Sequence, residues 1–353
     1  MSAHTGDRPA LVTGGCGFVG RHVVARLVRT GRSVWIIDDL STGRAPANWL
    51  SALGLKPFGD GNQHFTHPNG ASVTWVEGDL RQVLRAALHG EVRIPEFGEV
   101  FHLAAVVGGR LKIEGDPLSV ATDLAIDAEF FNWAIAARPE RILYASSSAA
   151  YPVDLQGENS HVALHEEMID FTSGRLGAPD MTYGWAKLTG EYLARIAAET
   201  YRLKVACVRP FSGYGEDQDE SYPIPAIAAR AARREDPLTV WGTGQQGRDF
   251  VHIEDCVTVM LLALSIIHDG GAINIGSGRL TNFLEVAQLF ADLAGYRPEI
   301  RTQTDKPVGV QARYADTSQL RARLQWSPEI SLEAGFARVL RAAEQRVRQS
   351  VLV

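Results

Sequence analysis

The sequence has little cysteine, no long apolar run and no excess of basic charge. Its three cysteines, Cys16, Cys207 and Cys256, are far apart and odd in number. This argues against a disulfide framework and fits a reducing cytoplasm. No run of about 18 apolar residues occurs, so we expect no membrane span. The polar stretch 1–8 predicts no signal segment.

The charge balance narrows the classes of partner. Acidic residues outnumber basic ones by 41 to 35, which gives a formal net charge of −6. An acidic protein is not attracted to a phosphate backbone, so we expect no general binding of nucleic acid or of a membrane surface. A single phosphate site lined by a few arginines remains compatible with this charge. We predict no metal site, since His64 and His67 have no assignable ligand partners.

What the sequence does contain indicates a globular enzyme with a parallel sheet. The 353 residues, 45% of them apolar, can bury a sizeable core. Short β-branched runs alternate with helix-length segments, which implies right-handed βαβ units and a Rossmann-like, doubly wound α/β fold with a smaller C-terminal lobe. The expected strands are 10–12, 33–37, 73–76, 100–103, 142–145 and 205–208.

After residue 208 the regular alternation of strand and helix patterns gives way to shorter elements. We predict a cofactor-binding domain over 1–208 and a mainly substrate-binding lobe over 209–353, with part of 236–275 packing back on the first domain. Segment 44–72 is long for a connection between strands and rich in Gly, Asn and His. It reads as a surface insertion, or alternatively as a mobile lid.

Three glycines follow the first expected strand and open the first expected helix. Gly14, Gly17 and Gly20 provide a tight turn and close backbone approach, and the helix start at Phe18 and Val19 offers free amide groups. A pyrophosphate group needs these features. The spacing Gly-x-x-Gly-x-x-Gly differs from the commoner Gly-x-Gly-x-x-Gly, so the motif alone is weak.

Acidic residues lie at the end of the second expected strand and shortly after the third. At Asp38, a carboxylate can accept hydrogen bonds from both adenosine ribose hydroxyls and would repel a 2′-phosphate, which favours NAD over NADP. Asp79, followed by Leu80, suits the adenine amino group. The alternative reading of Asp38 is an ordinary loop carboxylate at the end of a strand.

Tyr183 and Lys187 are spaced to lie on one helix face, one turn apart. A lysine ammonium favours the phenolate and so lowers a phenol pKa that is otherwise about 10. Such a phenol can remove a proton from a substrate hydroxyl while a nicotinamide accepts the hydride. Without a cofactor loop the pair would indicate only a half-buried ring and a solvated lysine.

With these motifs the chain resembles the nucleotide-sugar epimerases and dehydratases of the extended short-chain dehydrogenase/reductase superfamily. The similarity covers nearly the whole chain. The segments that carry it are Thr13–Gly20, 36–43, Asp79–Leu80, His102–Ala105, Ala145–Ser148, Tyr183 with Lys187, and Trp241–His252.

The resemblance implies further site residues. Ser147, four residues before a tyrosine, would hydrogen-bond the reacting hydroxyl, with Ser148 beside it in the substrate site; the alternative is a turn of small residues. Arg248 and Arg313 would bind the diphosphate of a nucleotide sugar through guanidinium forks, unless they are surface arginines in ion pairs. Ser212 stands where the family usually has Asn.

The resemblance also separates the possible reactions. Dehydratases of the family carry Asp-Glu directly after the active serine or threonine, where this chain has Ser148-Ala149. GDP-mannose 3,5-epimerases need a cysteine and a lysine at positions that read Ala149 and Pro223 here. The remaining serine, tyrosine and lysine with NAD suffice for epimerisation at one hydroxyl carbon, as in UDP-galactose 4-epimerases.

The sequence therefore predicts a cytoplasmic, NAD-dependent nucleotide-sugar 4-epimerase that regenerates its cofactor in each turnover. The resemblance favours a GDP-sugar slightly over a UDP-sugar. The alternatives are a nucleotide-sugar oxidoreductase or decarboxylase, a 3,5-epimerase, or a non-enzymatic binding protein on this fold. The family usually dimerises through the helix with the tyrosine and lysine and a helix near 118–137, so we expect a homodimer.

Overall fold

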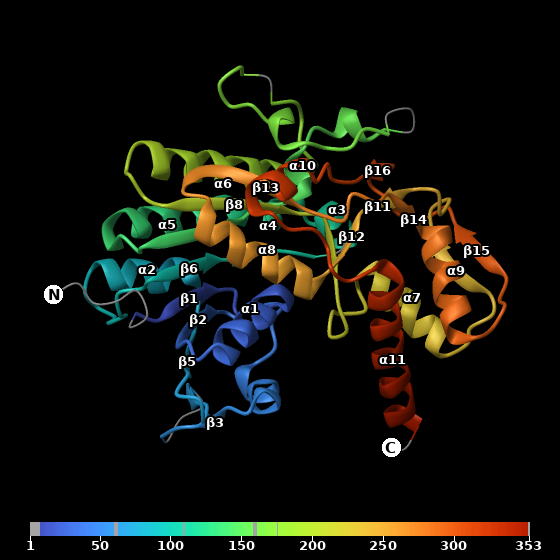
Figure 1. The fold of residues 1–353 in the computed structure, drawn as a ribbon, viewed down its shortest axis with the longest axis horizontal. Coiled ribbons are helices and arrows are strands. Elements are labelled where there is room, and N and C mark those ends of the chain that lie inside the picture. Colours follow the sequence, from blue (N-terminus) through green and yellow to red (C-terminus); the bar gives the residue numbers. More distant parts are fainter. Residues whose placement is uncertain (1–7, 60–62, 109, 158–160, 175, 352–353) are drawn as a thin grey trace.

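The computed structural model describes residues 8–59, 63–108, 110–157, 161–174 and 176–351. Figure 1 shows a large sheet with helices on both faces and, on the side of the C-terminus, a smaller group of helices and short strands. The predicted Rossmann-like fold is confirmed. The candidate site lies among the loops at the carboxyl ends of the central strands.

The main sheet has nine strands in the order β13-β8-β7-β6-β1-β2-β5-β4-β3. The first seven are parallel, and β4 pairs with β5 and with β3 in antiparallel fashion. The six predicted strands are all present, because runs such as Ala10–Thr13 are apolar and buried on both faces of the sheet. The bounds are β1 (Ala10–Thr13), β2 (Val34–Asp38), β3 (Lys56–Pro57), β4 (His64–Thr66), β5 (Ser72–Glu77), β6 (Glu99–His102), β7 (Arg141–Ala145), β8 (Val205–Pro210) and β13 (Asp269–Ile275).

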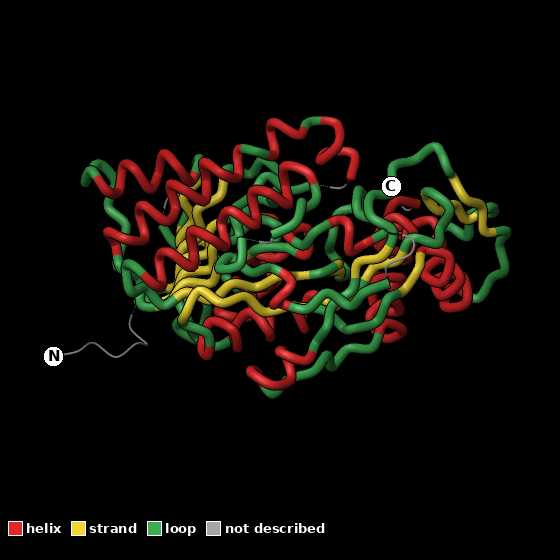
Figure 2. The backbone as a smooth tube through the Cα atoms, turned by 90° about the horizontal axis from the view of Figure 1, so that it is seen from above, coloured by secondary structure: helices red, strands yellow, loops and turns green. Residues whose placement is uncertain are grey.

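Helices cover both faces of this sheet, as Figure 2 shows. One layer contains α2 (Leu80–Leu88), α5 (Thr122–Ala137) and α6 (Met181–Glu199), and α5 packs between the other two. The other layer contains α1 (Phe18–Arg29) and α8 (Ile253–Ile266), with α10 (Ser318–Leu324) beside α8. Short helices α3 (Arg110–Gly115) and α4 (Pro117–Val120) lead into α5. In the part of the chain that the structure describes, no helix is both long and apolar enough to cross a bilayer.

Segment 44–72 extends the sheet. It contains the 3-10 turns η1 (Pro46–Asn48) and η2 (Leu50–Leu53) and the antiparallel strands β3 and β4 beside β5. Leu50, Leu55 and Phe65 are buried in the core that lies against this part of the sheet. The described part of the segment is therefore packed, as a surface insertion rather than a detached lid, and residues 60–62 lie outside the described ranges.

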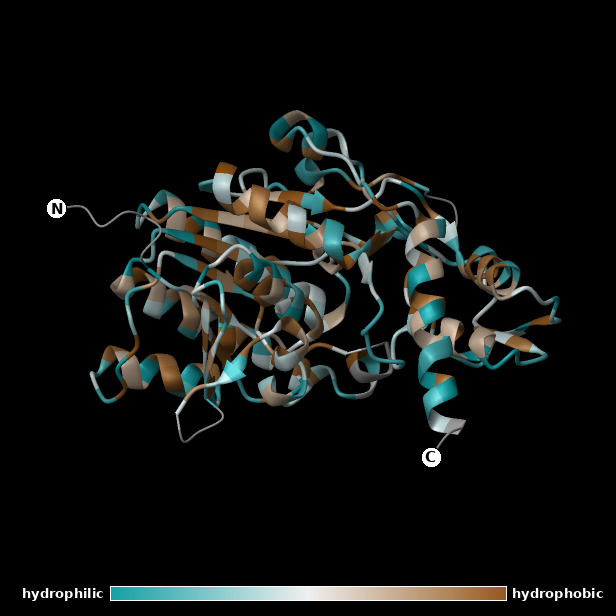
Figure 3. Ribbon diagram, turned by 60° about the horizontal axis from the view of Figure 1, so that its bottom comes forward, coloured by the Kyte–Doolittle hydropathy of each residue, from teal (hydrophilic) through white to brown (hydrophobic). Residues whose placement is uncertain are grey.

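A second core holds the smaller group together. Phe290 of α9 and Phe336 of α11 stack at 4.6 Å between ring centroids. The apolar stripe of α11 repeats at helical spacing at Phe336, Val339, Leu340 and Ala343, which are buried, while its outer face is largely hydrophilic in Figure 3. The elements are α7 (Pro223–Ala232), α9 (Phe283–Ala294), α11 (Leu332–Val351), β10 (Leu238–Trp241) and β15 (Ile300–Gln303).

Short elements connect the two groups. They are β9 (Ser212–Tyr214), β11 (Gly247–Arg248), β12 (Phe250–His252), β14 (Thr281–Asn282), β16 (Ala312–Arg313), η3 (Ser148–Ala150), η4 (Val153–Gln156) and η5 (Glu166–Met168). The buried carboxylate of Asp249 accepts hydrogen bonds from the backbone of Ser277, Gly278 and Ala315 and so ties three of these connections together. We propose the boundary between the two parts at residue 208, with the sheet strand β13 and helix α8 belonging to the first.

Candidate active site

The site lies at the carboxyl end of the sheet, between β1 and β6. These strands are neighbours, and the chain continues from β1 to β2 on one side and from β6 to β7 on the other. Such a switch point leaves a crevice where ligands bind in open parallel sheets. A pocket of about 130 Å³ lies here, and its walls come from the loops after β1, β2, β5 and β6. Among the predicted cofactor residues, the pocket walls include Gly14, Gly17, Asp38, Asp79 and Leu80.

The glycine loop forms a cradle that side chains would fill. Gly14 has φ +68°, and a Cβ there would stand 2.8 Å from the backbone nitrogen of Ala104. A Cβ on Gly20 would stand 2.2 Å from the carbonyl oxygen of Gly14. Gly17 is the N-cap of α1, so the first amides of the helix, at Phe18 and Val19, have no partner within the helix. The loop therefore fits the pyrophosphate of a dinucleotide.

Asp38 fixes the shape of this loop. Its Oδ2 accepts a hydrogen bond from the Cys16 amide at 2.9 Å, and its Oδ1 accepts one from the Leu40 amide at 2.8 Å. Burial raises the pKa of Asp38, and the two backbone hydrogen bonds oppose this shift. Each carboxylate oxygen has more than one lone pair, so Asp38 can still accept from a ribose hydroxyl. That role remains a proposal.

Asp79 makes local contacts that were not predicted from the sequence. Its carboxylate caps α2 by accepting from the Arg81 amide at 2.9 Å, and it pairs with the Arg81 guanidinium at 2.6 Å. The side-chain hydrogen bond from Arg81 lowers the pKa of Asp79. Arg81 also lines the pocket and was not predicted. A contact between Asp79 and an adenine amino group would have to share this carboxylate with Arg81.

The catalytic candidates come together from two elements. Tyr183 and Lys187 lie on α6, with the Lys187 Nζ 5.8 Å from the centre of the Tyr183 ring. Ser147 lies in the turn after β7, is half-buried, and has a side-chain hydrogen bond with Tyr183. Its oxygen also accepts from the Ala149 amide at 3.1 Å. Ser148 is 6% exposed, so Ser147 is the better placed of the two serines to reach a substrate.

The environment of Tyr183 differs in one respect from the prediction. Lys187 lowers the pKa of Tyr183 as expected, but burial is the larger influence, and the net result is a raised pKa. Burial opposes the charge of Lys187, while Tyr183, Asp127 and Asp123 favour it, and the pKa of Lys187 is raised overall. The lysine therefore stays charged, and the phenol in the unliganded protein stays protonated.

The two arginines that were expected at the diphosphate are neighbours on adjacent strands. Arg248 of β11 donates to the carbonyl oxygens of Gly247, Val308 and Val310. Arg313 of β16 donates to Asp180 at 2.9 Å and to Gln156 at 2.5 Å. Arg313 is thereby anchored to the residue that precedes α6.

Two groups with ionisable side chains, Tyr151 and Glu166, are buried near the site. Tyr151 is fully buried and donates to Asn274 at 2.7 Å, and it accepts from Arg209 at 3.0 Å. Glu166 is also buried and accepts from the Asn274 amide at 2.8 Å. A long-range hydrogen-bond network therefore holds Tyr151 and Glu166 in the core. Glu167 is exposed.

Sequence reasoning missed two further residues. Tyr222, just before α7, is half-buried, and Tyr183 is among the groups that raise its pKa to about 12, after burial itself. It brings a phenol from the smaller group of elements toward Tyr183. Asp123, in the first turn of α5, is a fully buried carboxylate that faces Lys187. No signal in the sequence distinguishes these residues from ordinary surface positions.

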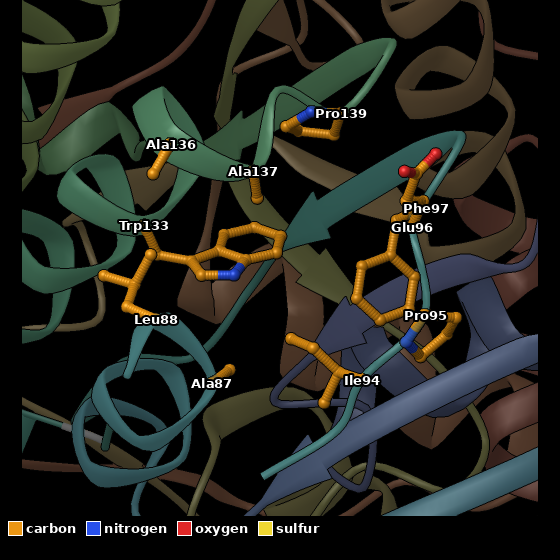
Figure 4. Close-up of a pocket in the computed structure, with 10 residues that line it drawn as sticks. All are labelled: Ala87, Leu88, Ile94, Pro95, Glu96, Phe97, Trp133, Ala136, Ala137 and Pro139. Carbon is orange, nitrogen blue, oxygen red and sulfur yellow. The ribbon is translucent and has the colours of Figure 1, made fainter. Parts of the chain in front are cut away.

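A second, larger pocket of about 350 Å³ lies elsewhere. It is lined by residues of α2 and α5, of the loop before β6 and by Pro139; these are mostly apolar, such as Trp133 and Phe97, but include Glu96, as Figure 4 shows. None of the predicted site residues lines it. Among the residues that the structure describes, no group of three or more His, Cys, Asp or Glu side chains is arranged to hold a metal ion.

The fold and the site together define a dinucleotide-binding protein of the Rossmann type with a tyrosine–lysine pair beside its cofactor crevice. The NAD dependent epimerase/dehydratase family matches residues 10–276, so the chain belongs to this family and its cofactor is NAD. This confirms the resemblance that the motifs indicated.

Individual relatives cover most of the chain. A UDP-glucose 4-epimerase of Mycolicibacterium smegmatis is 24% identical over 332 residues, which cover 94% of this chain and 96% of that protein. A GDP-L-fucose synthase of Sinorhizobium fredii is 28% identical over 248 residues, 68% of this chain and 76% of that protein. The crystal structure of a UDP-glucose 4-epimerase of Thermotoga maritima with UDP-glucose is similar with a TM-score of 0.77 and 25% identity, over 97% of this chain and 99% of that chain.

Proposed function

We propose that this protein is a nucleotide-sugar 4-epimerase that acts through a transient 4-keto sugar with bound NAD. The observation that carries the proposal is the meeting of Ser147, Tyr183 and Lys187 beside the dinucleotide crevice. Bound NAD supplies the acceptor and donor of the hydride. The protein has to hold the sugar hydroxyl, move its proton and allow the keto sugar to present its other face.

Each of the three side chains has one task in this reaction. The Tyr183 phenolate oxygen accepts the proton of the C4 hydroxyl, and the same phenol returns it after the sugar has turned. The Ser147 hydroxyl holds the reacting oxygen, because it lies within hydrogen-bond reach of the phenol. The Lys187 ammonium lowers the pKa of the phenol and so stabilises the phenolate.

The residues nearby support epimerisation at C4 over the other reactions of the family. Ala149 is 4% exposed, and Pro223 is the first residue of α7. Neither side chain can carry a proton, which a 3,5-epimerase or a dehydratase requires of its additional acid/base groups. The names of the relatives include both UDP- and GDP-sugar enzymes. We therefore propose a UDP- or GDP-sugar as the substrate.

A net oxidoreductase is the second candidate, favoured by the similarity to a GDP-L-fucose synthase. The two candidates differ in what happens to the cofactor. An epimerase regenerates NAD in every turnover, so many substrate molecules react per NAD, whereas an oxidoreductase consumes one cofactor molecule per product. Turnover of UDP- and GDP-hexoses with sub-stoichiometric NAD tests this. Product that stops at one equivalent of NAD would exclude the epimerase.

We propose that two copies associate through the outer face of α4, α5 and α6. Leu118, Leu124, Trp185 and Tyr192 on these helices are large apolar or aromatic residues that are 40–81% exposed. Exposed apolar side chains that gather on one face commonly mark a contact between proteins. Sedimentation at several concentrations would show whether the protein is a dimer or a monomer.

The three cysteines support a reducing compartment. Cys16, Cys207 and Cys256 are all buried and unbridged. Burial raises the pKa of each thiol, which keeps it protonated and unreactive. We propose the cytoplasm as the place of action, where such thiols stay reduced.

A further inference from the structure

Asp123 is a buried carboxylate, and its own hydrogen bonds are too few to stabilise its negative charge. Its side chain has no exposed surface. Oδ1 accepts a hydrogen bond from the Val106 amide at 2.5 Å, and Oδ2 has no hydrogen-bond partner among the described residues. Burying an ionised carboxylate is costly unless a charge of opposite sign lies nearby. The charged groups around Asp123 therefore determine whether its carboxylate is ionised and what it can attract.

One ammonium and a second carboxylate lie around it. Lys187 of α6 attracts Asp123, and Asp127, one turn further along α5, repels it. Asp127 accepts from the Tyr144 hydroxyl at 2.6 Å and is hydrogen-bonded to the His102 Nε2 at 3.0 Å. Burial lowers the pKa of His102, so its ring is neutral.

Two carboxylates and one ammonium leave one uncompensated negative charge in this buried cluster. Glu191 on α6 does not add to it, because Arg209 pairs with that carboxylate at 2.7 Å. Val106 and Thr122, the hydrogen-bond donor and the preceding neighbour of Asp123, both line the dinucleotide pocket. The excess charge therefore lies directly behind the wall of the cofactor site and beside Lys187.

We propose that Asp123 makes this site bind the oxidised, cationic nicotinamide in preference to the neutral reduced form. The inference rests on the proposed function, in which the nicotinamide reacts next to Tyr183. A negative charge in a buried environment attracts a cationic ring far more strongly than in water. The preference keeps a 4-epimerase working, because it favours return of the hydride to the keto sugar over release of the sugar from a reduced enzyme.

The preference should depend on pH in a defined direction. Burial raises the pKa of Asp123 to about 6. Its charge, and the preference with it, is present at neutral pH and is lost as the pH falls toward 5. Of the other groups in this cluster, Lys187, Tyr183 and Tyr144 have raised pKa values and keep their charge states in this window, and burial lowers the pKa of His102.

The test is the midpoint potential of the cofactor bound to the holoenzyme, measured by reductive titration and the absorbance of reduced nicotinamide. In Asp123→Asn at pH 8 we expect the preference for the oxidised form to fall about tenfold, which raises the midpoint potential by about 30 mV. Glu129→Gln is the matched control, because Glu129 lies on the same helix but pairs with the exposed Arg85. Its potential should equal that of the wild type.

Three outcomes would overturn the inference. These are an unchanged potential in Asp123→Asn at pH 8, an equal shift in the control, and a difference between variant and wild type that persists at pH 5. If Asp123→Asn does not fold, the wild type alone decides: the difference between its bound and free potentials must shrink between pH 8 and pH 5. A protein that holds no NAD would instead refute the proposed function.

Discussion

Gly184 and the carbonyl oxygen of Ala149 are in direct contact: a Cβ on Gly184 would stand 2.3 Å from that oxygen. The Asp180 amide donates to the same oxygen at 2.9 Å. Helix α6 is therefore pressed against the turn after β7, and this contact brings Tyr183 within reach of Ser147. The glycine that follows Tyr183 is thus part of the structure of the candidate site.

Gly184→Ala should separate the helix from the turn. Because the obstacle is a backbone oxygen, the helix has to move, and we expect a loss of about 1–3 kcal/mol in the free energy of unfolding together with a lower kcat. Denaturant unfolding and steady-state kinetics measure the two effects. Thr189→Ala, an exposed position on the same helix, should change neither by much. Full activity in Gly184→Ala would show that the contact does not position the tyrosine.

Arg248 and Arg313 are paired residues of the parallel strands β11 and β16. We expect Arg248→Ala to raise KM roughly tenfold or more with little change in kcat, because a diphosphate is bound equally in the ground and transition states. Arg313→Ala should also lower stability, since it removes the pairing with Asp180. Kinetics with a nucleotide sugar, alongside thermal unfolding, distinguish the two. An unchanged KM in Arg248→Ala would move the diphosphate away from this residue.

Tyr183→Phe should lower kcat by roughly 10²–10⁴-fold, because it removes the only proton acceptor proposed for the hydroxyl. Binding of the nucleotide sugar, measured by calorimetry, should be largely retained. Tyr201→Phe is the matched control, since Tyr201 is 42% exposed just after the same helix. A fully active Tyr183→Phe enzyme would refute the mechanism.

Lys187→Met should shift the pH profile of kcat/KM to higher pH. The base acts as the phenolate, so the rate rises as the pH passes upward through the pKa of Tyr183. Lys187 lowers that pKa against the larger effect of burial, and its removal should raise the pKa further. The pH profiles of wild type, Lys187→Met and the exposed-lysine control Lys204→Met test this. Superimposable profiles would show that the ammonium does not tune the phenol.

The local parts of the structure could be predicted from the sequence. Apolar, β-branched runs such as Val205–Val208 form strands that are buried on both faces of the sheet. The four-residue spacing of Tyr183 and Lys187 predicts that both lie on one face of the same helix. The glycine loop at Gly14 was recognisable because its position between a strand and a helix is part of the motif. These signals depend on neighbours within a few residues.

Contacts between distant segments could not be predicted in the same way. Tyr151 bonds to Asn274, which is 123 residues away, and this contact turns its side chain into the core. Asp123 is buried only because α5 packs between α2 and α6. An acidic residue on a helix otherwise indicates a solvated surface. The roles of both residues follow from the tertiary structure.

Carbon-bound hydrogen separates the candidate reactions most directly. A 4-epimerase returns the abstracted hydride to the same carbon, so its product should carry no solvent hydrogen on carbon. A 3,5-epimerase exchanges protons at C3 or C5, and a 4,6-dehydratase takes one up at C6.

Ala149 and Pro223 carry no acid or base. Tyr151 and Glu166 are held in the core. The described residues near the site therefore offer few groups that could transfer a proton to or from C3 or C5. Incubation with UDP- and GDP-hexoses in heavy water, followed by mass analysis, should therefore give a product without carbon-bound deuterium. Deuterium at C3 or C5 would instead assign the proton transfer to another group, of which the exposed Glu167 and the half-buried Tyr222 are the first to replace.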